Sequence, residues 1–239
     1  MQPAAAVERK SSFSEGLQAG ISIAVGYMPV ALAFGLIAKS TGLSIAEAVM
    51  MSLFVFAGAA QYISLNLIAA GTGAFEIVLT TFIMNIRHFL MAASLNERAE
   101  EERPWIKALY AFGITDETFS VASVKPGTLS SSYLFGLIFI SYSSWVAFSG
   151  IGHWAGQLLP LLLQESMSIA LYALFIGLLV PSLKAYRKVM VLAVSAAVLN
   201  SFFVLSGLFS AGWAIVLSTL ISSIGIEVIW RKKEVSTDE

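Results

Sequence analysis

Four long stretches without a charged residue constrain this chain more than any other feature of its sequence. They comprise 23 residues after Glu15, 28 after Glu47, 39 after Lys125 and 38 after Lys188. A bilayer core is about 30 Å thick and a helix rises about 1.5 Å per residue, so about 20 residues cross it. Each stretch is long enough for one crossing, and the last two are long enough for nearly two. The sequence therefore predicts an all-α, polytopic bundle of transmembrane helices.

The composition excludes several other classes of protein. Hydrophobic residues make up 57% of the 239 positions and charged residues only 12%, about half the roughly 25% charged expected of a soluble domain. This hydrophobicity excludes a disordered chain, and a net charge of −1 argues against nucleic-acid binding. The chain has no cysteine, which excludes disulfides and thiolate metal sites. Its two histidines are far apart in the sequence, which argues against a histidine-rich metal site. We expect no cofactor.

The apolar segments and the breaks between them predict about eight spans in a single transmembrane domain of residues 1–239. These spans cover residues 17–38, 45–69, 75–95, 106–124, 133–153, 166–183, 189–205 and 213–230. The fourth segment is ambiguous because it carries Asp116 and Glu117 at its centre. It crosses only if these carboxylates face protein or water. Without it the count is seven.

The distribution of lysine and arginine predicts the orientation of the chain. With eight spans and the N-terminus inside, nine basic residues are cytoplasmic, four are outside and Arg87 lies within a span. Because cytoplasmic loops carry an excess of basic residues, we expect residues 1–16 and 231–239 to be cytoplasmic tails. The charged loop at residues 96–107 is then extracytoplasmic. If the fourth segment did not cross, the basic clusters at residues 184–188 and 231–233 would both move outside.

Residues that break a helix or carry polar groups within the predicted spans are candidates for function, because polar groups in hydrocarbon are costly unless satisfied. Tyr27 and Pro29 belong to a Gly-Tyr-Met-Pro sequence at 26–29. Proline removes a backbone donor, so the first span either breaks there and exposes backbone groups or only kinks. In the second span, Gln61 follows four small residues that suit either close helix packing or a ligand.

The strongest single signal is the sequence Asn85-Ile86-Arg87-His88 in the third span. Asn85 and His88 are three residues apart and share a helix face, whereas Arg87 points elsewhere. Arg87 either binds a substrate carboxylate or neutralises Asp116 or Glu117. Adjacent carboxylates point about 100° apart on a helix, so one can pair with Arg87 while the other faces a cavity and exchanges protons. His88 is either a proton carrier or a hydrogen-bonded packing residue.

The order of these motifs resembles that of the AzlC family, the large subunits of bacterial branched-chain amino acid exporters. The resemblance covers nearly the whole chain. It rests on Gly-Tyr-x-Pro at 26–29, Ala-Phe-Gly at 33–35, the stretch 56–62, Asn-x-Arg-His at 85–88, Thr-Asp-Glu-Thr-Phe at 115–119, Gly-x-Leu-Leu-Pro at 156–160 and Leu-Val-Pro at 179–181. It implies a permease subunit of the bacterial inner membrane that works with a small membrane partner of the AzlD type. It also implies export of valine, leucine, isoleucine and methionine, driven by the proton gradient.

Three hypotheses for the function remain. The first is a secondary exporter of neutral amino acids, in which one set of polar residues binds substrate and another couples protons. The predicted substrate-binding residues are Tyr27, Pro29, Gln61, Asn85 and Arg87, and the predicted proton-coupling residues are Asp116, Glu117 and His88. The second is a structural or regulatory subunit whose partner forms the path, with an uncoupled channel as a variant. A membrane enzyme is disfavoured because the spans carry no metal cluster or paired Ser–His or Ser–Lys arrangement.

Overall fold

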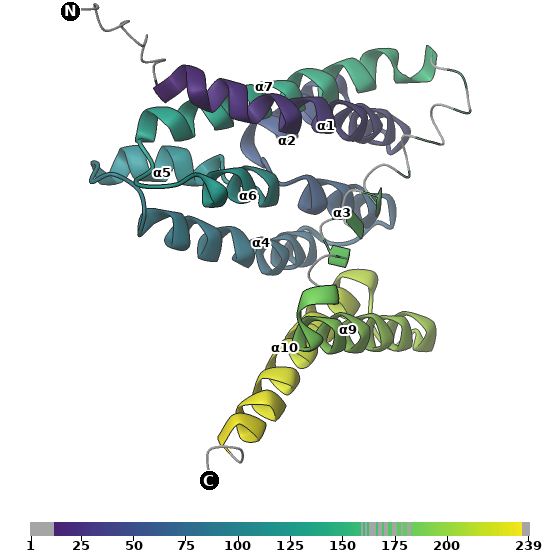
Figure 1. Cartoon of the computed structure of the whole chain (residues 1–239). Coiled ribbons are helices and arrows are strands. Elements are labelled where there is room, and N and C mark those ends of the chain that lie inside the picture. Colours follow the sequence, from purple (N-terminus) through teal and green to yellow (C-terminus); the bar gives the residue numbers. More distant parts are fainter. Residues whose placement is uncertain are drawn as a thin grey trace, which may run out of the picture. The chain divides into compact units, whose positions relative to one another are not determined.

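The computed structural model describes residues 12–158, scattered positions from 160 to 180, and residues 183–235. This part of the chain is built from helices (Figure 1). They are α1 Ser12–Ser40, α2 Ile45–Phe54, α3 Gly58–Ala69, α4 Ala74–Asn96, α5 Pro104–Phe112, α6 Asp116–Val124, α7 Ser131–Ala155, the short η1 Gly156–Leu158, α9 Arg187–Ser206 and α10 Ala211–Val235. Among the described residues, α1, α4, α7, α9 and α10 are long and apolar enough to cross a membrane. The prediction of a helical multi-pass membrane protein is confirmed.

The chain divides into two compact units. The first comprises Met1–Gly58 and Asn85–Gln164, and the second comprises Ala59–Met84 and Glu165–Glu239. The helices α3 and α4 therefore each contribute residues to both units. The predicted single transmembrane domain stays a prediction, and half of the predicted span at residues 166–183 lies outside the described residues.

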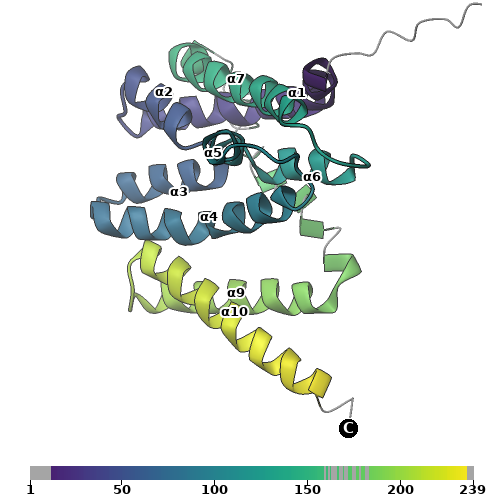
Figure 2. The same cartoon turned by 90° about the vertical axis from the view of Figure 1, so that its left-hand side faces the viewer.

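The core of the first unit is the contact between α1 and α7, which lie side by side in both views (Figures 1 and 2). Glycines let the two backbones touch. A Cβ atom at Gly16 would overlap the Tyr133 carbonyl, and one at Gly152 would overlap the Leu32 carbonyl. Small residues of this kind allow the close packing on which helix association in membranes depends. Because early residues of α1 meet early residues of α7 and late residues meet late ones, the two helices run parallel.

The helix α1 is continuous through residues 26–29, so of the two alternatives that the sequence leaves open there, the break does not occur. Pro29 lies inside the helix. The contacts with α7 extend on both sides of it, and Ser144 of α7 donates a hydrogen bond of 2.7 Å to the Ala24 carbonyl. A proline inside a membrane helix is tolerated where neighbouring helices support the backbone around it. The same partner supports both halves of α1 and keeps it in one piece.

The second predicted span, residues 45–69, is interrupted instead. The helix α2 ends at Phe54 and α3 begins at Gly58. Their ten and twelve residues measure about 15 and 18 Å, so neither helix crosses a core of about 30 Å alone. At the other end of α2, the Ser44 side chain caps the Glu47 N–H and the Glu47 carboxylate accepts from the Ser44 N–H at 2.7 Å. This capping box fixes where α2 starts.

The ambiguous fourth segment, residues 106–124, lies in the two short helices α5 and α6 and does not form one continuous helix. Each has nine residues and measures about 13.5 Å. The chain folds back at residues 113–115, because the segments that flank the pair lie together. Ala99 pairs with Leu129 in an isolated bridge, and the Glu100 N–H donates to the Leu129 carbonyl at 2.9 Å. We call residues 104–124 the α5–α6 hairpin.

In the second unit, α9 and α10 correspond to the predicted spans at residues 189–205 and 213–230. Gly207 ends α9 in the left-handed conformation, with a φ of 64°, which glycine adopts without strain. The carboxylate of Glu76 in α4 then binds the start of α10, accepting from the Ser210 hydroxyl and from the Trp213 N–H at 3.2 Å. A carboxylate satisfies the free donors at a helix N-terminus, so Glu76 attaches the α9 and α10 pair to α4.

Candidate functional site

The polar residues of the candidate site gather at the start of α6 in the first unit. The Thr115 hydroxyl accepts a hydrogen bond of 3.3 Å from the Thr118 N–H, and the Thr118 hydroxyl accepts one of 2.7 Å from the Thr115 N–H. This reciprocal cap satisfies two of the backbone donors that a helix start leaves free. Asp116 and Glu117 occupy the first turn, where the helix macrodipole stabilises negative charge. The local sequence thus places two carboxylates at one helix start.

Arg87 of α4 forms an ion pair with Asp116. Its Nη2 atom lies 3.0 Å from Asp116 Oδ2, and the two side chains are 40% and 23% exposed. Arg87 is near the middle of α4, about 14 Å from its C-terminal end. Arg87 Nε is buried and has no hydrogen-bond partner among the described residues. The guanidinium therefore neutralises Asp116 and keeps a donor for a further acceptor.

Glu117 points to a different neighbour, Tyr27 of α1. The Tyr27 hydroxyl donates a hydrogen bond of 2.6 Å to Glu117 Oε2 and lies 2.7 Å from the Thr115 hydroxyl. Tyr27 is only 4% exposed. In the part of the chain that the structure describes, no lysine or arginine forms an ion pair with Glu117. Asp116 thus faces a cation and Glu117 faces a neutral hydroxyl. Adjacent residues on a helix point about 100° apart, which allows the two carboxylates to have different partners.

Aromatic rings surround Tyr27, and some of them lie at the break between α2 and α3 and at the end of α5. Phe56, between α2 and α3, contacts the Tyr27 ring edge-on at a centroid distance of 6.1 Å and the Tyr142 ring at 5.1 Å. Phe112, at the end of α5, lies 6.1 Å from Tyr142. Trp145 of α7 lies 5.2 Å from Tyr27. These edge-on pairs are favourable, and they bring both helix breaks to the same aromatic residues of α1 and α7.

The other predicted site residues lie elsewhere on the helices. Asn85 and His88 are half-buried on α4, and Asn85 Oδ1 is buried without a hydrogen-bond partner in the described chain. Pro29 is exposed on α1, and Gln61 is fully buried in the part of α3 that belongs to the second unit. Their roles in binding and coupling stay predictions. No group of three metal-binding side chains occurs in the described part of the chain, and the expected lack of a cofactor stays a prediction as well.

Sequence reasoning missed the cap at Thr115 and the aromatic contacts of Tyr142. It treated residues 115–118 as the polar centre of one span. The local signal was present, because Gly113 followed by Thr-Asp-Glu-Thr is typical of one helix ending and another beginning. Tyr142 gave no such signal, because aromatic residues are common in apolar spans. Its hydroxyl donates a hydrogen bond of 2.7 Å to the Leu53 carbonyl near the end of α2.

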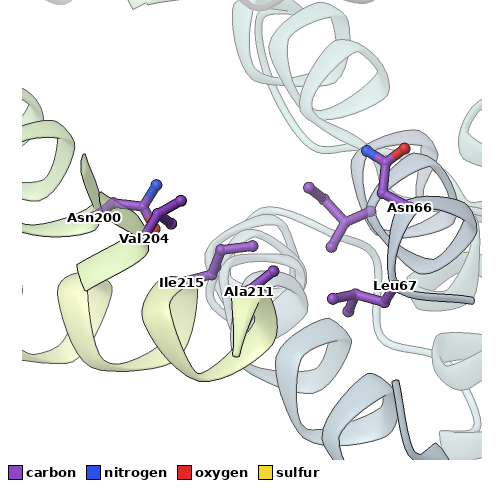
Figure 3. A pocket seen from close by; sticks show the side chains of 7 residues that line it. Asn66, Leu67, Asn200, Val204, Ala211 and Ile215 are labelled. Carbon is purple, nitrogen blue, oxygen red and sulfur yellow. The ribbon is translucent and has the colours of Figure 1, made fainter. Parts of the chain in front are cut away.

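The second unit carries a small pocket of its own, with a volume of about 210 Å³ (Figure 3). Residues of α3, α9 and α10 line it: Ile63, Asn66, Leu67, Asn200, Val204, Ala211 and Ile215. Asn200 Oδ1 is buried and has no hydrogen-bond partner among the described residues. The pocket is thus mainly aliphatic, with two amide side chains in its wall.

Comparison with known proteins connects this architecture to a family. The family model described as AzlC protein matches residues 22–159. The inner membrane protein YgaZ of Escherichia coli is 35% identical over 202 residues, which cover 80% of each chain. An uncharacterized membrane protein of Archaeoglobus fulgidus is 32% identical over 84% of this chain and 89% of its own. The branched-chain amino acid transport protein AzlC of Bacillus subtilis is 24% identical over 93% of this chain and 86% of its own. No solved structure matches the chain.

The matched region begins within α1 and ends just after η1, so it includes Tyr27, Arg87, Asp116 and Glu117. It covers more than half of the 239 residues. Similarity to the Escherichia coli and Archaeoglobus proteins extends further along the chain. The resemblance is confirmed, and this chain belongs to the AzlC protein family.

Proposed function

We propose that this protein is a secondary transporter subunit that exports branched-chain and other neutral aliphatic amino acids across the bacterial inner membrane, coupled to protons. Family membership, the names of its relatives and five long apolar helices among the described residues support a role in membrane transport. The observation that carries the proposal is the Arg87–Asp116 pair beside the Tyr27–Glu117 hydrogen bond, at a helix start within a membrane domain. Ionisable groups at such a depth are costly and mark substrate or ion pathways.

In this proposal, the substrate lies at the start of α6. Its carboxylate binds Arg87, whose Nε donor has no partner among the described residues. Its ammonium group binds Asp116, which exchanges part of its contact with Arg87 for the substrate. The aromatic rings of Phe56, Tyr142 and Trp145 provide an apolar surface for the aliphatic side chain. A zwitterion with an apolar side chain matches this combination of charge pair and aromatic wall.

Glu117 is the stronger candidate for proton coupling of the two carboxylates. Its partner is the neutral Tyr27 hydroxyl, so binding a proton removes a charge without leaving a cation unpaired. Protonating Asp116 would leave the Arg87 charge without its partner, and an unpaired charge away from water is strongly unfavourable. We therefore assign proton coupling to Glu117 and the neutralisation of Arg87 to Asp116. His88 remains the alternative proton carrier.

The proposal is tested by measuring intracellular amino acids in cells fed leucine-containing and valine-containing dipeptides. Deleting the gene for this chain is expected to raise intracellular leucine and valine several-fold, and supplying it with a small AzlD-type partner is expected to restore both levels. Dipeptide uptake, measured in parallel, serves as the control. Unchanged leucine and valine after deletion would refute the function. Full restoration by the small partner alone would make this chain an accessory subunit instead.

A further inference from the structure

The parallel helices α1 and α7 give the first unit two ends. At one end Gly16 packs against Tyr133, near the start of both helices. At the other end, beyond α1, the Leu43 carbonyl lies 2.8 Å from Nε2 of His153 in α7. Since both helices are long enough to cross a membrane, these ends lie at opposite membrane faces. We call them the start face and the end face.

The helix α6 spans only about half of the distance between the start face and the end face. Lys125, at its C-terminal end, pairs with Glu15 at 3.0 Å and lies 4.3 Å from the centre of the Tyr133 ring, and both partners are at the start face. The other end of α6 meets Tyr27, close to the middle of α1. The helix α6 therefore runs from the middle of the unit back to the start face.

The helix α5 enters from the same face. The bridge between Ala99 and Leu129 places the chain before α5 beside the chain after α6. At the turn between the two helices, a Cβ atom at Gly113 would overlap the side chain of Ile138, well inside α7. The α5–α6 hairpin thus begins at the start face, reaches the middle of the unit and returns to the start face.

Arg98 attaches the end of α4 to the same place. Its guanidinium donates to the carbonyls of Ser123 at 2.8 Å, of Lys125, and of Gly127 at 3.1 Å. The helix α4, a candidate span of 23 residues, therefore ends at the start face, and a full crossing requires that it begin at the end face. The helix α2 also begins at the end face, directly after α1 and Leu43. Residues 45–73 then start and finish on one side of the membrane and make no net crossing.

The charge distribution supports the same conclusion. Relative to eight full crossings, this topology moves Arg98, Arg103 and Lys107 to the side of the N-terminus. With the N-terminus inside and a crossing at residues 166–183, twelve basic residues are then cytoplasmic instead of nine, and Lys39 is the one outside. An excess of twelve over one fits the positive-inside rule better than nine over four. Both termini remain cytoplasmic.

We infer that the protein has six full crossings and two re-entrant helix pairs, α2 with α3 and α5 with α6, which enter from opposite membrane faces. Their breaks at Phe56 and at residues 113–115 meet the middle of α1 and α7 around Tyr27 and Tyr142. Irregular backbone at membrane depth is tolerated where protein or a water-filled cavity surrounds it, and transporters form substrate sites from such discontinuous helices. The inference rests on geometry within the first unit, on the length of α4 and on charge, and it does not depend on the proposed substrate.

The test uses single cysteines in a chain that naturally has none. A membrane-impermeant maleimide is applied to intact spheroplasts and to permeabilised ones. We expect Ala70→Cys to react in intact spheroplasts, like the control Leu208→Cys between α9 and α10. Glu101→Cys is expected to react only after permeabilisation, like the control Thr128→Cys after α6. Eight full crossings predict the reverse for positions 70 and 101, so reaction of Glu101→Cys in intact spheroplasts would overturn the inference.

A second measurement tests the hairpin itself. Ala99→Cys combined with Leu129→Cys is expected to form a disulfide under mild oxidation, because these residues pair across the ends of the α5–α6 hairpin. The product is detected in membranes by mass spectrometry of the linked peptides. Absence of the cross-link in protein that is inserted and elutes as a single species would contradict the re-entrant arrangement.

Discussion

Replacing Arg87 with alanine is expected to lower the initial rate of leucine counterflow in proteoliposomes by about a hundredfold. The change leaves Asp116 without the cation that lies 3.0 Å away and removes the proposed partner of the substrate carboxylate. A hydrogen-bonded contact to a charged group contributes about 1.5 to 3 kcal/mol. The contact of a guanidinium with a carboxylate lies toward the upper end of this range, and losing it from the rate-limiting state of transport lowers the rate by about a hundredfold.

Two further variants separate substrate binding from neutralisation of Asp116. The double variant Arg87→Ala/Asp116→Asn has no unpaired charge, so it is expected to recover a normal yield of folded protein but not transport. Arg87→Lys keeps the charge and loses the planar fork that binds a carboxylate, so an intermediate rate is expected. Arg103→Ala, in the exposed loop before α5, is the control and is expected to transport normally. Full transport by the double variant would show that Arg87 only neutralises Asp116.

Replacing Glu117 with glutamine is expected to abolish accumulation of leucine driven by a pH gradient while leaving exchange at equal pH largely intact. Glutamine has nearly the same shape, and its side-chain oxygen still accepts the hydrogen bond from Tyr27 that Glu117 receives at 2.6 Å. The local structure is therefore preserved, and only the ability to bind a proton is lost. Uptake against an imposed pH gradient, counterflow at equal pH and the signal of a pH-sensitive dye inside the vesicles are compared in one preparation.

The control for this substitution is Glu100→Gln, which changes an exposed carboxylate in the loop before α5 and is expected to leave coupling unchanged. Tyr27→Phe removes the hydroxyl that binds Glu117 and Thr115 and is expected to weaken coupling without abolishing it. If Glu117→Gln still accumulated leucine with proton movement in the wild-type ratio, proton coupling would have to be assigned to Asp116 or His88.

The charged residues of the site were predictable because charges are rare in apolar spans. Arg87, Asp116 and Glu117 stood out from the sequence for that reason, and the divergence of two adjacent carboxylates follows from helix geometry. The structure brings all three together with Tyr27. The aromatic residue Tyr142 was not predictable as a neighbour of this site, because its contacts depend on which helices pack together.

The re-entrant pairs were not predicted because hydropathy sums apolar character along the chain and carries no information on direction. Two nine-residue helices such as α5 and α6 have together the length of one span. Pro29 is a strong helix-breaking signal in isolation, and from the sequence alone a break and a kink were both possible there. The helix α1 stays continuous because α7 contacts it on both sides of Pro29. The sequence around Pro29 carries no information on this contact.

The most direct test of the central claim, that this chain carries neutral aliphatic amino acids, is leucine counterflow in proteoliposomes. Three preparations are compared: this chain alone, this chain with a small AzlD-type partner, and the partner alone. We expect saturable accumulation of labelled leucine in vesicles that contain this chain with its partner, inhibited by valine and isoleucine and not by lysine or glutamate. Flux with the partner alone, or no flux with both subunits inserted and folded, would contradict it.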